Sequence, residues 1–306
     1  MSEIKNKLLK NYKHKKKWAR KNGLECYRLY DKEIPQYPYL IDIYQNQVIL
    51  FDRRIDKIDQ DKEHLFEETL EAISEVLGID KEFINVKKRI IQTKQDKYTK
   101  FDKSNNQFVV REGDAKAIVN LQDYIDTGLF LDHRPMRTYL ANNSENKSLL
   151  NLFCYTSMVS VQAAIGGAIT TNIDLSNTYI QWSIDNFRVN KLDTEKHEFI
   201  ARDVFSYLEE AVEKKFDIIF LDPPTFSNSK KMQDILDIER DHIRLIEACM
   251  KRLNENGVLY FSNNKRGFQL DDNVEKFFNV KNITKKTIPK DFKDQKIHVC
   301  FEIRNK

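Results

Sequence analysis

The sequence predicts an α/β protein, with a mostly parallel seven-stranded sheet that ends in an antiparallel hairpin and follows a small α+β domain. From about residue 145, short apolar runs alternate with helical stretches, the pattern of parallel strands joined by crossover helices. Before residue 126, strand-like runs instead cluster around one helical segment. The length of 306 residues agrees with two domains, at roughly 150 residues per domain.

Residues 1–22 are expected to form a basic helix that ends near Asn22-Gly23. Residues 1–21 hold nine lysines and arginines against one acid, although the whole chain carries a net charge of only +4. Such an arm favours a phosphate-bearing partner, and a merely solvated helix is the alternative. The candidate RNA contacts in this helix are Lys13, Lys15, Lys16, Lys17 and Arg20.

Residues 23–126 are expected to form the small α+β domain. Its strand candidates are rich in aromatic and β-branched residues and cover 26–30, 39–44, 48–52, 84–91, 108–111 and 117–121. Helical spacing of apolar residues spans 62–77 and stops at Gly78.

Residues 127–306 are expected to form the larger domain. Its strand candidates cover 149–153, 169–174, 198–201, 216–222, 257–262, 285–288 and 298–303. Helical patterns fill the gaps at 157–166, 177–189, 204–214, 234–254 and 271–278. The last two strands have no helix between them, so we expect them to pair as the antiparallel hairpin.

In such a sheet, ligands bind at the carboxyl ends of the strands, so the residues that leave each strand matter most. The loop Phe153–Ser157 lacks the GxGxxG of a dinucleotide site, and a nucleoside without a pyrophosphate fits better. Asp174 lies 21 residues after Phe153, which suits either a bond to ribose hydroxyls or a helix cap. Asp203 follows the third strand, and it suits either a hydrogen bond from the exocyclic amine of adenine or a helix cap.

The fourth and fifth strands are followed by the most specific signals. Asp222-Pro223-Pro224-Thr225-Phe226 follows an apolar strand, and the two prolines hold a rigid corner on which a planar base can stack. Asn263, Lys265 and Arg266 follow the next strand and are residue types that bond base edges or phosphates.

Several classes of protein are disfavoured by what the sequence lacks. No apolar run approaches the roughly 20 residues that span a bilayer, and the first residues show no signal-peptide core. The four cysteines form no CxxC pair. We therefore expect a cytoplasmic protein without a membrane partner, a disulfide framework or a metal.

Together these residues resemble the class I S-adenosylmethionine-dependent methyltransferases, whose fold is Rossmann-like. The resemblance is sharpest to guanine-N7 methyltransferases of large-subunit (23S) ribosomal RNA, best known as the C-terminal half of a bifunctional bacterial protein. It covers nearly the whole chain. The segments that carry it are 18–30 (WARKNGLECYRLY), 126–134 (DTGLFLDHR), 151–156 (NLFCYT), 220–231 (FLDPPTFSNSKK) and 261–268 (FSNNKRGF).

The resemblance implies S-adenosylmethionine as cofactor, and 23S ribosomal RNA or a large-subunit assembly precursor as partner. It implies that Asp174 holds the ribose and Asp203 the adenine edge. The full cofactor-binding set is Asp132, Arg134, Phe153, Tyr155, Thr156, Ser157, Asp174, Asp203 and Asp222. The set expected to receive the target base is Asp222, Pro223, Pro224, Phe226 and Asn263. The bifunctional protein's guanine-N2 half has no counterpart here, so we expect a stand-alone N7 enzyme.

Other functions remain as alternatives. Guanine N7 has a free lone pair, so its methylation needs positioning and no nucleophile, whereas cytosine-C5 methylation needs a cysteine thiolate. Related cytosine enzymes place that cysteine where this chain has Ser262-Asn263-Asn264. Adenine-N6 methylation fits less well, because Thr225 stands at the expected aromatic position. The last alternative is a non-catalytic RNA-binding factor. The observation behind it is Ser157, which replaces the family's usual glycine.

Overall fold

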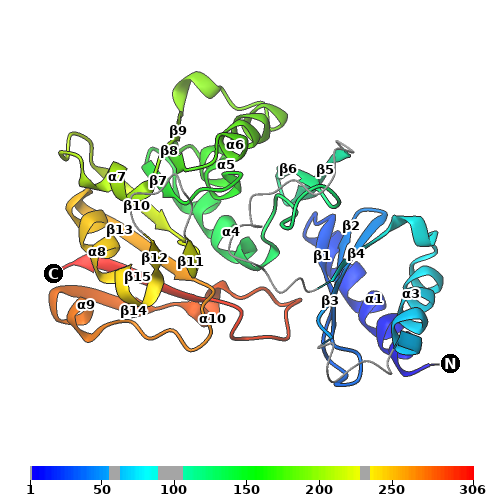
Figure 1. The fold of residues 1–306 in the computed structure, drawn as a ribbon. Helices are drawn as coiled ribbons and strands as arrows, with labels where there is room; N and C mark the ends of the chain where they lie inside the picture. Colours follow the sequence, from blue (N-terminus) through cyan, green and yellow to red (C-terminus); the bar gives the residue numbers. More distant parts are fainter. Residues whose placement is uncertain (1, 55–62, 89–105, 228–234) are drawn as a thin grey trace. The chain divides into compact units, whose positions relative to one another are not determined.

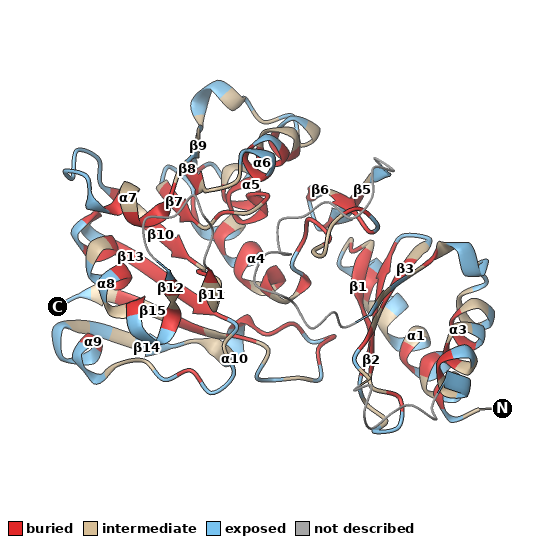
Figure 2. Cartoon of the chain, in the orientation of Figure 1, coloured by how far each residue is buried: buried red, intermediate tan, exposed pale blue. Residues whose placement is uncertain are grey.

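The computed structural model describes residues 2–54, 63–88, 106–227 and 235–306. Its contacts divide the chain into two compact units. Unit 1 comprises Met1–Thr127 and Lys290–Asp294, and unit 2 comprises Gly128–Pro289 and Gln295–Lys306. Each unit has its own buried core (Figures 1 and 2). The short segment Lys290–Asp294 therefore joins unit 1 by its contacts, although it lies late in the sequence.

Unit 1 is a four-stranded sheet with two helices packed on it. The strand order is β1-β2-β3-β4, antiparallel except for the parallel pair β3 and β4. A separate hairpin is formed by β5 and β6. The bounds are α1 Glu3–Lys21, β1 Cys26–Asp31, β2 Tyr39–Tyr44, β3 Gln47–Asp52, α3 Glu63–Leu77, β4 Ile84–Lys88, β5 Gln107–Glu112 and β6 Ala115–Asn120. Residues 89–91 of the predicted strand 84–91, like residue 62 of the predicted helix 62–77, lie outside the described residues.

Helix α1 is an integral part of unit 1. The Ser2 side chain caps its first turn, and Gly23 follows its C-cap with a φ of +64°, which favours glycine. Ile4 and Leu8, one turn apart, are completely buried in the same cluster as side chains of α3 and the sheet. The helix therefore contributes to the core while its other faces carry lysines.

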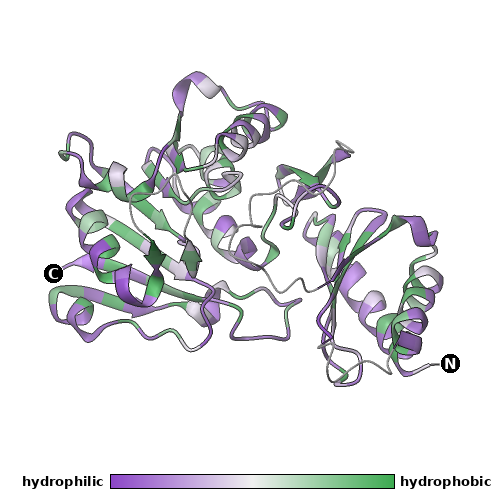
Figure 3. Ribbon diagram, viewed as in Figure 1, coloured by the Kyte–Doolittle hydropathy of each residue, from purple (hydrophilic) through white to green (hydrophobic). Residues whose placement is uncertain are grey.

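Unit 2 contains the predicted seven-stranded sheet. Its order is β14-β15-β13-β10-β7-β8-β9, with β13, β10, β7, β8 and β9 parallel and β15 antiparallel to both of its neighbours. The bounds are β7 Ser148–Leu152, β8 Ile169–Asp174, β9 Glu198–Ala201, β10 Phe216–Leu221, β13 Leu253–Asn263, β14 Phe278–Asn282 and β15 Val299–Asn305. Figure 3 shows that hydrophobic residues concentrate on these strands.

Helices cover both faces of this sheet. Side chains of α7, α8 and α9 pack in the cluster on one face, and those of α4 and α5 pack in a second cluster, while α6 contacts α5, β8 and β9. The bounds are α4 Arg134–Asn143, α5 Met158–Ile165, α6 Asn177–Val189, α7 Val204–Glu209, α8 Ile238–Lys251, α9 Asp272–Phe277 and α10 Thr284–Thr287. Among the described residues, no helix combines the length and apolar character that crossing a membrane requires.

Three sequence-based predictions of local structure are wrong. The predicted strand 285–288 is the short helix α10, and the hairpin partner of β15 is instead β14. The predicted helices 204–214 and 234–254 end earlier, at Glu209 and Lys251, and residue 234 is outside the described residues. Helix α4 was not predicted.

Candidate functional site

The carboxyl ends of four neighbouring strands meet at one edge of the unit 2 sheet. Leu152 of β7 lies opposite Leu221 of β10 on one side and Ile173 of β8 on the other. Leu221 in turn lies opposite Phe261 of β13. The chain proceeds outward from β7 through β8 to β9 and returns to β10, so the boundary between β7 and β10 is the topological switch point.

The loop after β7 has an unusual backbone. Phe153, Tyr155 and Ser157 all have positive φ, from +52° to +57°. This left-handed conformation explains why the resembled family favours glycine at the position of Ser157. The Ser157 hydroxyl is completely buried and hydrogen-bonds to Ser183 Oγ at 2.8 Å on α6. Thr156 Oγ1 donates to the Gly128 carbonyl at 2.6 Å, so the loop is held from two directions.

Asp174, at the end of β8, fixes this loop. One carboxylate oxygen accepts from Tyr155 N and the other from Ser176 N, both at 2.9 Å. Burial raises the pKa of Asp174 to about 6, although the backbone hydrogen bonds act to lower it. The N-cap of α6 is Ser176, so Asp174 is not that helix's cap.

Asp203, after β9, does cap a helix. Its Oδ2 accepts from Ser206 N at 2.9 Å at the start of α7. The side chain is buried. The capping role that the sequence left open for Asp203 is therefore present, and a role toward adenine stays a prediction.

Asp222, after β10, is paired with a histidine. His133 Nε2 lies 3.1 Å from Asp222 Oδ2, and the histidine is buried whereas the carboxylate is about one quarter exposed. Pro223 is buried and Pro224 half-buried. Phe226 begins a short strand, β11 (Phe226–Ser227), that pairs with β12 (Leu236–Asp237). Residues 228–231 of the motif lie outside the described residues.

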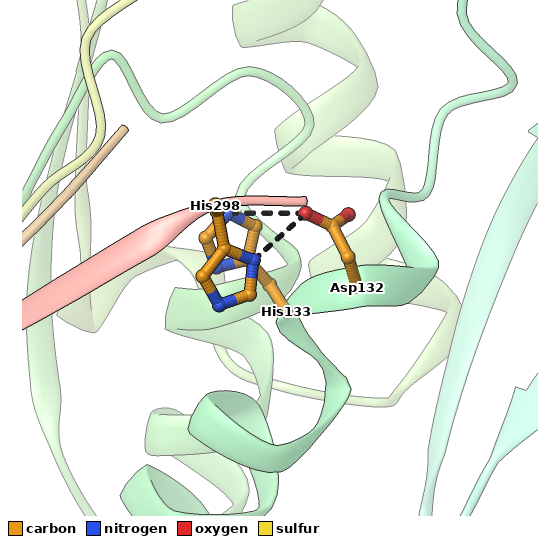
Figure 4. A group of neighbouring side chains, drawn as sticks. All are labelled: Asp132, His133 and His298. Carbon is orange, nitrogen blue, oxygen red and sulfur yellow. Dashed lines mark hydrogen bonds and ion pairs between the residues drawn. The ribbon is translucent and has the colours of Figure 1, made fainter. Parts of the chain in front are cut away.

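His133 is itself held by a second histidine, as Figure 4 shows. The His133 and His298 rings stack with centroids 4.8 Å apart and 7° between their planes. His298 Nδ1 lies 3.1 Å from Asp132 Oδ2, and its Nε2 lies 2.9 Å from Thr287 Oγ1. Arg134 directly follows His133 in the sequence, and it is buried at the start of α4.

The charges of this group are coupled. Burial acts to lower the pKa of His133, but the carboxylates of Asp222 and Asp132 outweigh it and raise that pKa to about 9. The histidines in turn hold the pKa of Asp132 below its usual range, against the effect of burial. His133 is therefore an imidazolium at neutral pH, with the Asp222 and Asp132 carboxylates 3.1 and 3.9 Å from its Nε2.

The ligating atoms of Asp132, His133 and His298 lie within 4.8 Å of one another, close enough to consider a metal ion. An ion bound by two imidazoles lies near the plane of each ring, which two stacked rings do not allow. His133 Nε2 and both nitrogens of His298 also have hydrogen-bonding or ionic partners already. This geometry suits hydrogen bonding between the side chains better than a shared metal.

Asn263, at the end of β13, offers an unused donor. Its side chain is completely buried, and Oδ1 accepts from Lys265 N at 3.0 Å. Nδ2 has no hydrogen-bond partner within the part of the chain that the structure describes. Because buried donors are rarely left unpaired, this amide points to an acceptor on a bound ligand.

All four cysteines are buried, including Cys154 in the loop after β7 and Cys249 on α8. Cys300 on β15 lies opposite Ser262, at the end of β13, so one thiol is near the strand ends. Burial, together with the Asp222 carboxylate, raises the pKa of Cys300. That thiol is protonated at neutral pH and is a poor nucleophile.

The predicted RNA contacts differ in how available they are. Lys13, Lys16, Lys17 and Arg20 are exposed on α1. The Lys15 ammonium instead donates to three carbonyl oxygens, those of Arg28, Leu29 and Asp291, at 2.9–3.2 Å. These bonds use its three N–H groups, so we leave Lys15 out of the RNA-contacting set. In unit 2, Lys265 pairs with Glu239, and Arg266 is exposed.

Sequence reasoning did not select His298, and it named His133 only as part of the segment 132–134 expected near the site, without a role of its own. His133 lies inside the DHR segment, between two chosen residues. His298 directly precedes β15, and an antiparallel strand begins at the edge where its parallel neighbours end. That rule could have placed His298 at the site.

Comparison with known proteins identifies the protein family of the chain that carries this strand-end site. Residues 102–277 match the family model of S-adenosylmethionine-dependent methyltransferases. The chain belongs to this family. Its cofactor is accordingly S-adenosylmethionine, and the resemblance found in the sequence is confirmed.

Two relatives extend the match to nearly the whole chain of this methyltransferase. It is 46% identical to "Ribosomal RNA large subunit methyltransferase K" of Neisseria meningitidis, covering 98% of this chain and 86% of that protein. It is 48% identical to "Ribosomal RNA large subunit methyltransferase K/L" of Legionella pneumophila, covering 97% of this chain but only 42% of that longer protein.

Solved structures agree on the fold. A Streptococcus mutans protein assigned as a SAM-dependent methyltransferase matches with a TM-score of 0.77 at 24% identity. That match covers 98% of this chain and 80% of the other. The predicted Rossmann-like methyltransferase fold, with a small domain before it, is confirmed.

Proposed function

We propose that this methyltransferase transfers a methyl group from S-adenosylmethionine to N7 of a guanine in 23S ribosomal RNA. The 46% identity to a large-subunit methyltransferase K over nearly both chains supports the substrate class. The observation that carries the choice of atom is the site at the end of β10 and β13. It presents an orienting carboxylate, a rigid proline corner and a buried amide donor.

The residues after β7, β8 and β9 fit the cofactor. The Asp174 carboxylate is held by two backbone amides and is the natural acceptor for two ribose hydroxyls. Asp203 follows the next strand, where the adenine edge would lie. The loop Phe153–Ser157 passes beside Asp174 and would enclose the remainder. Bound S-adenosylmethionine supplies an electrophilic methyl group on a sulfonium.

The residues after β10 and β13 would position the guanine. Guanine presents N7 and O6 as adjacent acceptors, and the unpaired Asn263 Nδ2 can donate to O6. Asp222, oriented by His133, is close to where the guanine becomes cationic and stabilises that charge. Pro223 and Phe226 offer surfaces for a base flipped out of its stack. No proton must be removed from N7, so no general base is needed.

The test is to identify the methylated nucleoside directly. Purified enzyme, labelled S-adenosylmethionine and a 23S transcript are incubated, and the RNA is digested and analysed by mass spectrometry. We expect 7-methylguanosine, which Asp222→Ala and Asn263→Ala reduce on the order of a hundredfold through lost positioning.

The same digest separates the alternatives. Formation of 5-methylcytidine, or a covalent adduct with RNA containing 5-fluorocytosine, would replace the proposal by cytosine-C5 chemistry. Cofactor-independent RNA binding with no methylated product would indicate a non-catalytic factor.

A further inference from the structure

Unit 1 contains a cavity of about 530 Å³ that the methyl-transfer site does not use. Its walls come from the second half of α1, the end of α3, the turn between β2 and β3, and β5. Every lining residue belongs to unit 1. The volume falls within the usual range for small-ligand sites, roughly 300–1,000 Å³.

The walls of this cavity are positively charged. Lys16 and Arg20 of α1 and Arg111 of β5 line it, against one acid, Glu25. The Glu25 carboxylate already accepts from Arg111 N at 2.8 Å and from Gln45 Nε2 at 2.9 Å, and lies 3.5 Å from the Arg111 guanidinium. The Glu25 carboxylate thus has its partners among the lining residues themselves. The net positive charge of the lining favours an anion.

Aromatic rings accompany these cations. Tyr12 and Tyr27 line the cavity, and the Lys16 ammonium lies 4.8 Å from the centroid of the Tyr12 ring. Gln45 and Asn46, in the turn between β2 and β3, add side-chain amides. Gln45 Nε2 already donates to Glu25 and to the Val109 carbonyl, so Gln45 offers its Oε1 as an acceptor, whereas the Asn46 amide can both donate and accept. Tyr12 is half-buried and Tyr27 is buried, so Tyr12 offers the larger ring surface. Cations beside an accessible aromatic ring are the combination that binds single-stranded nucleic acid.

The cavity also continues an exposed basic face. Lys13, Lys16, Lys17 and Arg20 occupy positions i, i+3, i+4 and i+7, so they share a side of α1. Lys16 and Arg20 belong to both this face and the cavity. An RNA backbone that followed the helix would therefore reach the opening.

We propose that this cavity binds one unstacked nucleotide from a single-stranded part of the RNA substrate. The base lies against Tyr12 and bonds the amides of Gln45 and Asn46, while the flanking phosphates contact Lys16, Arg20 and Arg111. The inference rests on the proposed function, because it takes RNA as the substrate. It assigns unit 1 a binding site separate from the one that receives the methylated base.

The first test measures binding of a fluorescent 12-nucleotide single-stranded RNA to the full chain by anisotropy. Tyr12→Leu keeps apolar volume but removes the ring, so we expect at least fivefold weaker binding with an unchanged salt dependence. Lys16→Gln/Arg20→Gln should reduce the log–log salt slope by roughly 1.4, for two lost phosphate contacts. The matched control Lys10→Gln/Lys81→Gln removes two exposed lysines that do not line the cavity, and should change binding less than twofold.

The second test locates the nucleotide. RNA containing 4-thiouridine is photo-crosslinked, and the linked peptide is identified by mass spectrometry. We expect crosslinks to Tyr12 or Tyr27, and their loss in Asn46→Trp, which blocks the opening with a bulky ring. Wild-type affinity in both Tyr12→Leu and Asn46→Trp, with crosslinks elsewhere, would overturn the proposal. Asn46→Trp also gives a reading if Tyr12→Leu fails to fold.

Failure here is distinguishable from failure of the proposed function. Product 7-methylguanosine with cavity variants that bind and turn over like the wild type removes only the cavity proposal. Crosslinks at Tyr12 without any 7-methylguanosine remove only the guanine-N7 proposal.

Discussion

Asp174 shows how one side chain can serve both the fold and a ligand. Its two oxygens each accept a hydrogen bond from a backbone amide, and the proposed function assigns the ribose hydroxyls to the same carboxylate. A carboxylate can accept further bonds at its remaining lone pairs. If the proposed ribose role holds, removing Asp174 disturbs the loop after β7 and cofactor binding together.

We predict that Asp174→Ala weakens S-adenosylmethionine binding by roughly 10- to 150-fold, equivalent to about 1.5–3 kcal/mol for lost charged hydrogen bonds. Isothermal titration calorimetry measures this, with circular dichroism to verify the fold. Glu198, an exposed acid on β9, gives the control Glu198→Gln, which should bind normally. A normal dissociation constant for Asp174→Ala would reject the ribose role.

The raised pKa of Asp174 predicts a pH dependence. With a pKa of about 6, the carboxyl is protonated in the free enzyme below that pH and loses acceptors for ribose hydroxyls. Affinity for the cofactor should therefore fall as pH drops from 7 to 5, with about half a proton released per cofactor bound at pH 6. In Asp174→Asn this dependence should disappear. Calorimetry in buffers of different ionisation enthalpy counts the proton.

His133 is expected to act as a positioning residue for Asp222. We predict that His133→Asn lowers turnover on the order of a hundredfold, with little change in KM for RNA, because Asp222 loses its orientation. Because the pKa of His133 is raised in the folded state, its protonated ring stabilises the fold, and this stabilisation is fully present below pH 6.5. It is lost as pH rises through about 9, where the ring loses its proton. The stability difference between wild type and variant should shrink over that window in thermal unfolding. A constant difference would contradict the ion pair.

Cys300 is the thiol that best discriminates the two base chemistries, since it lies opposite Ser262. We predict that Cys300→Ser keeps turnover within about tenfold, because a buried protonated thiol contributes packing rather than nucleophilic attack. Cys249→Ser, on α8, is the matched control for packing effects. Complete loss of activity in Cys300→Ser alone would favour cytosine-C5 methylation.

At the scale of elements, α1 combines the basic surface that the sequence suggested with a role in the core that the sequence analysis did not predict. Its apolar residues are buried in the unit 1 core, so deleting residues 1–21 would expose that core rather than test RNA contact. Side-chain replacement is the sound alternative. We predict that Lys13→Gln/Lys17→Gln preserves stability and lowers the salt slope of RNA binding by roughly 1.4. An unchanged slope would identify these lysines as solvated surface.

The elements also show where sequence patterns stop being informative. The parallel strands and their helices were predictable because two signals are local in the sequence. Short apolar runs alternate with stretches of helical spacing, and polar residues follow the ends of the strands. Residues 285–288 appear strand-like, but the Asn282 side chain accepts from Thr284 N and a helical turn follows. Only Phe278, the first residue of β14, lies within the predicted helix 271–278, and the rest of that strand was not predicted. His298 bonds Asp132 across 166 residues of sequence, and no local pattern reports such a pair.

On the scale of the whole molecule, Lys290–Asp294 ties the late part of the chain to unit 1. Arg28 N donates to Asp291 Oδ2 at 2.8 Å, and Asp31 Oδ2 accepts from the backbone of Lys293 and Asp294. The Arg28 guanidinium lies 4.1 Å from the centroid of the Phe292 ring. Unit 1 is therefore incomplete without residues that follow most of unit 2.

We predict that Asp291→Ala destabilises unit 1 by about 1.5–3 kcal/mol. The substitution leaves the buried backbone amide of Arg28 without its carboxylate acceptor and removes a negative charge near the Lys15 ammonium. Differential scanning calorimetry should show a lower melting temperature. The exposed neighbour gives the control Lys290→Ala, which should melt like the wild type. Equal melting of both variants would show that the segment is only passively attached.

The position of β15 in its sheet has a consequence for synthesis. β15 is inserted between β13 and β14, yet it is the last strand of unit 2 to leave the ribosome. Until it arrives, β13 and β14 have no common neighbour, and His133 lacks the ring of His298 on which it stacks. The nascent chain can thus form β7 to β10 early but completes the site only after residue 305 is free. The order of translation itself delays the completion of this strand-end site until all the other strands of unit 2 have been synthesised.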